Sequence, residues 1–328
     1  MGAASVLRRK NASFGLLVVF LLAVIVFLIL GRFGSLPTAD LPNPISIGGS
    51  DLPVYTTSFE GVSRPVPIAL SPDGGRIYVG ETGGERWIKI LAPNGTEIGK
   101  FAPPNSNPGG RNPVGIAVKA DGTVYVVDTL QNKVLKFDPS GGYLGEVARP
   151  LNRPWGPTAA AFDSAGNLYI TDAIAIPEVV NQRILVYDAK DQFVRAFTGT
   201  AGQTAGSIYY PRAVAVDSKG RIYISNFDVV KAFDRDGAFL FALNSATDSP
   251  NLAKGLAVMN STLYVVDSVN GRFMVYDVSG DQPGTPSARG EIGVDSGQFR
   301  FPEGIAVAND GRVYISDREN NRVSVWSR

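Results

Sequence analysis

The feature that most constrains this sequence is a repeat of roughly 40–50 residues, which occurs six times after residue 52. Each copy opens with a short apolar segment such as GIAV at 115–118. One alanine marks the same position in all six segments, at intervals of 48, 44, 54, 42 and 49 residues: Ala69, Ala117, Ala161, Ala215, Ala257 and Ala306. A repeat of this length is one supersecondary unit, so residues 52–328 are predicted to form one domain of six similar units.

Each copy has the pattern of a small antiparallel sheet. A turn that contains Gly or Asn follows the apolar segment and supplies the positive φ that a tight hairpin needs. The next segment alternates around a tyrosine in every copy: Tyr78, Tyr125, Tyr169, Tyr223, Tyr264 and Tyr314. A third strand follows in all copies, and a weaker fourth strand follows in five. Four strands per repeat predict an all-β, six-bladed β-propeller with four-stranded antiparallel blades.

The sixth copy has three strands and ends near Trp326, which would leave an apolar strand at an open edge. One unassigned strand, PVYTTSFEG at 53–61, precedes the first copy. Pairing it beside 323–326 would complete the sixth blade and remove the unpaired edge. The ring is therefore predicted to be closed by this N-terminal strand.

The N-terminus carries a predicted membrane anchor. An uncharged apolar helix is expected at 14–31, after a short basic segment at 1–13 and before a Pro/Gly-rich tether at 32–51. A cleaved signal peptide is the alternative, but the 17-residue apolar run at 14–30 is longer than such peptides use. The basic residues before the helix predict a cytoplasmic N-terminus and an extracytoplasmic propeller, periplasmic or on the cell surface.

Composition limits the chemistry. The chain has no histidine and no cysteine, which removes the usual general base and the commonest transition-metal ligands. The 31 basic and 30 acidic side chains give no electrostatic footprint for nucleic acid.

The copies at 115–138 (GIAVKADGTVYVVDTLQNKVLKFD) and 304–326 (GIAVANDGRVYISDRENNRVSVW) resemble the NHL-repeat family of six-bladed propellers. The resemblance implies the fold. It implies little about function, because relatives with this fold bind proteins or RNA, act in adhesion or sensing, or are enzymes.

A carboxylate or amide ends the second strand of every copy: Glu81, Asp128, Asp172, Asn226, Asp267 and Asp317. In three copies a cation follows five residues later: Lys133, Arg272 and Arg322. Because the feature repeats in every blade, we interpret it as a loop cap rather than a metal site.

A binding site is expected at positions where the six copies differ from one another. Three positions before the aligned alanines, where inner strands should begin at one mouth of the channel, the copies carry different residues: Val66, Val114, Thr158, Arg212, Lys254 and Glu303. This polar arc facing an apolar arc predicts a binding rim, the alternative being that exposed loop residues vary freely. Four further residues are predicted to join the rim, with blade-closing aromatics as the competing interpretation: Arg153, Trp155, Tyr209 and Tyr210.

Two functions remain open. The first is a non-enzymatic docking module that binds a protein or glycan at the channel mouth, or a subunit of an envelope assembly, with no cofactor. The alternative, implied by the resemblance, is a calcium-dependent gluconolactonase-like hydrolase or lyase, for which Glu303 is the one metal-ligand candidate among the rim positions. The related peptide-amidating lyases hold zinc through histidine, which this chain lacks. A sensor would need a partner, because the 13 residues before the anchor hold no effector domain.

Overall fold

The computed structural model describes residues 52–150, 154–176, 179–180, 182–198, 205–226, 229–243, 250 and 252–328. The predicted basic segment, membrane helix and tether (1–13, 14–31 and 32–51) lie outside the described residues and stay predictions. Within the described ranges, no helix combines the length and the apolar character that crossing a bilayer requires.

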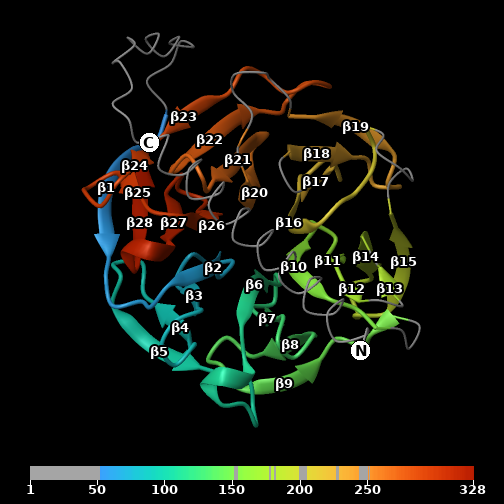
Figure 1. Cartoon of the computed structure of the whole chain (residues 1–328), viewed down its shortest axis with the longest axis horizontal. Coiled ribbons are helices and arrows are strands. Elements are labelled where there is room, and N and C mark those ends of the chain that lie inside the picture. The colour runs from blue at the N-terminus through green and yellow to red at the C-terminus, as the bar shows by residue number, and fades with distance from the viewer. Residues whose placement is uncertain are drawn as a thin grey trace, which may run out of the picture. The chain divides into compact units, whose positions relative to one another are not determined.

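The described chain forms a six-bladed β-propeller with four antiparallel strands in each blade, as predicted (Figure 1). Blade 1 contains β2 (Pro65–Leu70), β3 (Ile77–Glu81), β4 (Ile88–Leu91) and β5 (Glu97–Phe101). Blade 2 contains β6 (Pro113–Val118), β7 (Val124–Asp128), β8 (Lys133–Phe137) and β9 (Tyr143–Glu146). Blade 3 contains β10 (Pro157–Phe162), β11 (Leu168–Asp172), β14 (Arg183–Tyr187) and β15 (Phe193–Phe197).

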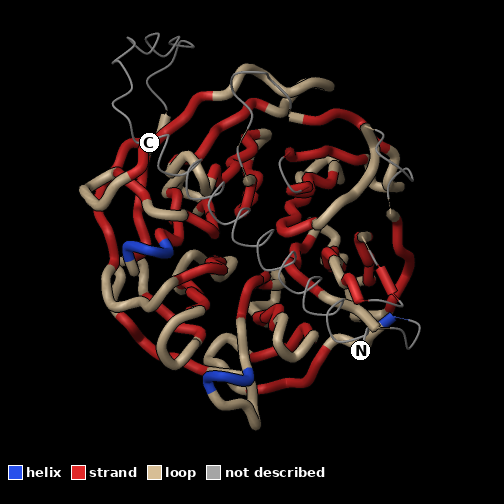
Figure 2. Tube along the Cα trace, in the orientation of Figure 1, coloured by secondary structure: helices blue, strands red, loops and turns tan. Residues whose placement is uncertain are grey.

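Blade 4 contains β16 (Pro211–Val216), β17 (Ile222–Asn226), β18 (Val229–Phe233) and β19 (Phe239–Ala242). Blade 5 contains β20 (Ala253–Met259), β21 (Thr262–Asp267), β22 (Arg272–Asp277) and β23 (Ser287–Arg289). Blade 6 contains β26 (Pro302–Val307), β27 (Val313–Asp317) and β28 (Arg322–Ser327), and takes its fourth strand from β1 (Val54–Phe59). Loops connect the strands, with only short helical turns among the described residues (Figure 2).

A few short elements lie outside the six four-stranded blades. The insertion in the third copy forms a hairpin of β12 (Ala175–Ile176) and β13 (Val179–Val180). Between blades 5 and 6, β24 (Glu291–Ile292) pairs in parallel with β25 (Gln298–Phe299). The two described 3₁₀ turns are η1 (Pro108–Gly110) and η3 (Arg318–Asn320).

The N-terminal strand closes the ring, which confirms the prediction made from the orphan segment. β1 pairs antiparallel with β28, with Phe59 opposite Val323 and Tyr55 opposite Trp326. The Tyr55 and Trp326 rings meet edge to face, with centroids 5.8 Å apart. The first and last described strands thus share one sheet, and the apolar β28 is covered by β1, which forms the outer edge with its exposed threonines.

The core lies between blades. Six clusters of buried apolar residues, one at each blade junction, join the tyrosine of the repeat to the inner strands of the next blade. Tyr78 of blade 1, for example, packs with Ile116 and Val126 of blade 2. The repeated tyrosine is therefore the residue that joins successive blades, which explains its presence in all six copies.

The inner strands approach each other closely around the channel. A Cβ added to Gly304 would lie 2.2 Å from the carbonyl oxygen of Val66 in the neighbouring blade. A Cβ added to Gly255 would lie 2.5 Å from the carbonyl oxygen of Glu303. Only glycine permits these two backbones to come this near.

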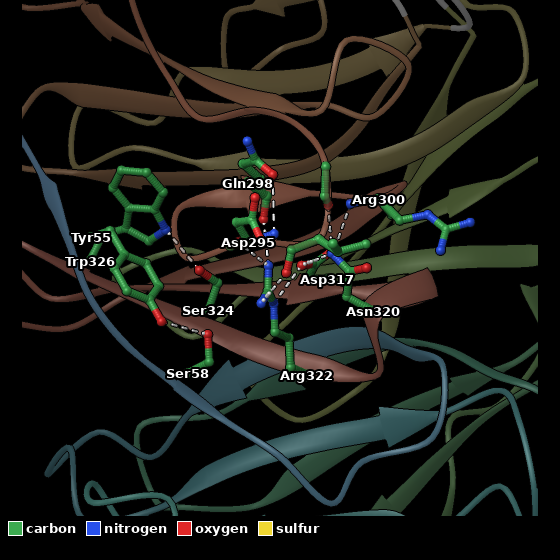
Figure 3. A network of polar contacts seen from close by, with 12 residues as sticks. Tyr55, Ser58, Asp295, Gln298, Arg300, Asp317, Asn320, Arg322, Ser324 and Trp326 are labelled. Carbon is green, nitrogen blue, oxygen red and sulfur yellow. Dashed lines mark hydrogen bonds and ion pairs between the residues drawn. The ribbon is translucent and has the colours of Figure 1, made fainter.

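A buried polar network fastens the loop of the closing blade (Figure 3). Arg322 donates from Nε to Asp317 Oδ2 at 2.8 Å, and its Nη atoms donate to backbone carbonyls of the loop at 294–298. Asp317 also accepts from the Arg300 N–H at 2.8 Å and from Asn320 Nδ2 at 2.7 Å. Burial raises the pKa of Asp317 above its ordinary value despite these donors.

Candidate functional site

A β-bulge recurs at the start of every inner strand. The pairing of each inner strand with its neighbour shifts register just after its first residue, as between Pro211 and Val214 in blade 4. A bulge adds an unpaired residue and re-aims its side chain. The residues in this position are the six of the predicted rim: Val66, Val114, Thr158, Arg212, Lys254 and Glu303.

All six rim residues line one cavity of about 410 Å³ in the channel, at the face where the inner strands begin. We call these the mouth cavity and the mouth face. The structure thus brings together the residues that the repeat alignment predicted. Loop residues that the alignment did not identify also line the cavity: Thr82, Asn112, Thr129 and Arg318.

One side of the mouth cavity is uncharged. Val66 and Val114 contribute apolar side chains from blades 1 and 2. Thr158 donates its hydroxyl to the carbonyl oxygen of Pro211 at 2.7 Å and contacts Thr171 Oγ1 at 2.7 Å. The bond to Pro211 links blades 3 and 4.

The other side is charged. Glu303 forms ion pairs with Lys254 (Nζ to Oε2, 3.2 Å) and with Arg318 (Nη1 to Oε1, 3.7 Å). Arg212 is exposed and, among the described residues, forms no ion pair. Three cations and one carboxylate line the cavity, which gives it a formal charge of +2.

The carboxylates that end the second strands are structural caps, as interpreted from the repeat. Asp128 accepts the Asn112 N–H at 3.0 Å, and Asp172 accepts the Gly156 N–H at 2.8 Å. Each bond ties the end of a second strand to the residue just before the inner strand. Burial raises the pKa of Glu81, which holds the corresponding place in blade 1.

The cation expected beside each cap varies. Arg272 and Arg322 pair with Asp267 and Asp317 as the spacing suggested. The expected pairing of Lys133 is wrong, because its ammonium reaches Glu146 on the neighbouring strand at 2.6 Å.

In blade 3 the cap has a cation that the spacing did not reveal. Arg183 takes this place and contacts Asp172 at 2.8 Å. The insertion at 173–180 separates the two residues and hid the pair from a five-residue spacing rule.

The predicted aromatic part of the rim needs correction. Trp155 is only 2% exposed and packs with Val147 and Tyr187 at the junction of blades 2 and 3, so it is a core residue. Arg153 lies outside the described residues. Tyr209 is 54% exposed and meets Tyr210 edge to face at 4.7 Å, just before β16. Neither tyrosine lines the mouth cavity, and both lie on the mouth face beside it.

A second column on the mouth face was not evident from the sequence. In four blades the residue before the inner strand has positive φ without being glycine: Arg64 (45°), Tyr210 (46°), Leu252 (62°) and Phe301 (52°). Such backbone strain in non-glycine residues is typical of functional loops. Phe301 is also 53% exposed. Other apolar loop residues on this face are exposed too, including Leu130 (54%) and Val269 (39%).

Among the described residues, no three acidic side chains are grouped so as to hold a metal ion. Glu303, the acidic residue among those lining the mouth cavity, already contacts two cations.

Two protein-family models and one relative match parts of the chain. The NHL repeat model matches residues 299–326, and the SMP-30/gluconolactonase/LRE-like region matches 53–174. The Brain tumor protein of Drosophila melanogaster is 30% identical over 134 residues, which is 39% of this chain and 12% of that relative's length. Each of these matches covers less than half of the chain, and all agree with the six-bladed propeller seen in the structure.

Solved structures agree on the fold. A streptogramin B lyase matches with a TM-score of 0.60 and 14% identity, over 85% of this chain and 99% of that one. A catalytically inactive virginiamycin B lyase from Staphylococcus aureus, solved with quinupristin, matches with a TM-score of 0.56 and 16% identity, over 84% of each chain. The Cps50 (Swd1) propeller of Myceliophteria thermophila matches with 0.59 and 11%, over 84% of this chain and all of that one. At such identities the likeness establishes the fold alone.

Proposed function

We propose that this protein is a docking module that binds a protein partner at the mouth face and is held at a membrane by the predicted helix at 14–31. The observation that carries the proposal is the asymmetry of the mouth cavity. Blades that share one scaffold present Val66 and Val114 on one side and Arg212, Lys254 and Glu303 on the other. A scaffold alone needs no such difference, whereas a recognition surface does.

The loops around the cavity support this proposal. Phe301, Tyr209 and Leu130 are more than half exposed on the mouth face. Exposed aromatic and aliphatic side chains beside charged groups are typical of protein interfaces. A glycan partner would instead be held mainly by hydrogen bonds. The polar side chains of the lining already bond within the chain: Thr82 Oγ1 donates to the Arg64 carbonyl oxygen at 2.9 Å, and Asn112 Nδ2 donates to Thr129 Oγ1 at 2.9 Å.

The alternative is a calcium-dependent hydrolase or lyase, which the gluconolactonase-like match at 53–174 favours. Calcium takes six to eight oxygen ligands, commonly several carboxylates. Glu303, the carboxylate among the cavity-lining residues, lies within 3.2–3.7 Å of Lys254 and Arg318. Two cations beside the single acidic ligand do not fit a calcium site, and this favours docking.

The proposal is tested by purifying tagged full-length protein from its native membrane in mild detergent and identifying bound proteins by mass spectrometry. The variant R212A/K254A removes two charges from the mouth. The control R76A/K190A removes two charges from turns on the opposite face. We expect a stoichiometric partner with the wild type and the control, and its loss with R212A/K254A. Equal recovery from all three would contradict the proposal.

A further inference from the structure

We propose that the mouth cavity accepts a carboxylate from an acidic segment of the partner protein. This inference rests on the docking function and adds the chemistry of the occupant. The cavity, with a formal charge of +2, lies in a chain whose 31 basic and 30 acidic side chains almost balance. The positive charge of the cavity lining is therefore not a property of the chain as a whole.

Arg212 is the residue best placed to receive this group. It is exposed, lines the cavity, and has no ion pair among the described residues. A guanidinium presents a planar set of donors that matches a carboxylate in a bidentate arrangement. Because its side chain is exposed, it can reorient toward an incoming group.

Lys254 and Arg318 supply the second half of the site. Lys254 contacts Glu303 at 3.2 Å, and Arg318 lies between the carboxylates of Glu303, at 3.7 Å, and Glu319, at 3.4 Å. The Nε atom of Arg318 is buried and, in the described part of the chain, has no hydrogen-bond partner. A carboxylate of the partner beside Glu303 would supply the missing acceptor for Arg318 Nε.

An acidic protein segment fits these features better than a nucleic acid. A nucleic acid strand is held by cations spread along a groove that follows its phosphates. Here three cations gather around one cavity of about 410 Å³, and Glu319 lies 3.4 Å from one of them, Arg318. The exposed Phe301 and Val269 suit apolar side chains flanking an acidic residue.

Glu303 gives the proposal a distinctive consequence. If the ligand is an anion, the Glu303 carboxylate competes with it for Lys254 and Arg318. E303Q should therefore raise affinity, by about tenfold if the lost competition is worth a typical partly buried charge interaction. If Glu303 instead holds a cation or a donor group of the ligand, the same change would abolish binding.

The experiment measures fluorescence anisotropy with the full chain in mild detergent. The probes are three labelled decapeptides with the same leucine-containing flanks and a centre of Asp-Glu-Asp, Asn-Gln-Asn or Lys-Arg-Lys, together with a ten-nucleotide oligouridylate. The variants are E303Q, R212A and the opposite-face control R76A. Circular dichroism checks that each variant keeps its fold.

We expect the acidic peptide to bind most tightly, to weaken about tenfold with R212A and with added salt, and to tighten with E303Q. Failure of the acidic peptide to bind up to about 1 mM would overturn the inference. So would equal binding of the amide peptide, tighter binding of the oligouridylate, or loss of binding in E303Q. If any of these occurs while R212A/K254A still releases the native partner, the proposed docking function is retained. Only the inference that the partner presents an acidic segment is then wrong.

Discussion

Three cations occupy the same place in their repeats: Lys133, Arg272 and Arg322. Their contacts predict very different contributions to the free energy of unfolding. Arg322 is 8% exposed and donates four hydrogen bonds. Its acceptors are the carboxylate of Asp317, at 2.8 Å, and the backbone carbonyls of Val294, Asp295 and Gln298, at 2.7–3.0 Å. Replacing it by methionine keeps much of the volume and removes all four bonds.

The expected costs follow from burial. R322M leaves a buried carboxylate without its cation, which typically costs about 3–5 kcal/mol. R272M removes one ion pair, to Asp267, from a side chain that is 26% exposed, so about 1–3 kcal/mol is expected. K133M breaks a pair with Glu146 in which both side chains are close to half exposed, and should cost less than about 1 kcal/mol.

The assay is urea unfolding of each full-length variant, followed by circular dichroism, with the free energy of unfolding compared at equal slope. The double variant R322M/D317N should recover part of the loss, because it also removes the unpaired buried charge. Equal losses at the three positions would refute the reasoning, since they would mean that repeat position, and not the observed contacts, sets the energy.

Two further predictions concern the scaffold. G304A should lower the free energy of unfolding by about 1–3 kcal/mol, because its Cβ would clash with the Val66 carbonyl oxygen at 2.2 Å. In the control G99A, the Cβ would lie 3.5 Å from its nearest neighbour, so this change should be tolerated. Equal unfolding midpoints for the two variants would contradict the prediction. Burial raises the pKa of three tyrosines well above 10: Tyr125, Tyr187 and Tyr223. Their contribution to stability should be complete below about pH 10. Above about pH 10 tyrosines ionise in the unfolded chain, so the contribution of each should fall by up to about 1.4 kcal/mol per pH unit. A free energy of unfolding that stays constant to about pH 11.5 would be the contrary result.

Much of the fold could be predicted because the repeat encodes it locally. Turn residues, strand alternation and the repeated tyrosine recur in every blade, and the orphan strand at 53–61 has one open edge to pair with. The same alignment located the rim, because equivalent positions in equivalent blades meet around one axis. Arg212, Lys254 and Glu303 were found in this way.

What the sequence did not reveal depends on how loops fold. The aromatic ring of Trp155 suits an interface or a core equally well, and the structure buries it at a blade junction. Arg318 lies outside the aligned column and reaches the cavity because the 3₁₀ turn η3 follows Asp317. The positive φ of Phe301 has no signal in the sequence, because a bulky residue before proline is expected to be extended.

The central claim is that a partner docks on the mouth face. The most direct measurement places a photo-cross-linking amino acid at position 212, and in a matched protein at Ser140, in a turn on the opposite face. Both full-length proteins would be irradiated in native cells. The account predicts a discrete cross-linked product from position 212 and none from position 140. Cross-links of equal yield from both positions, or from position 140 alone, would contradict it.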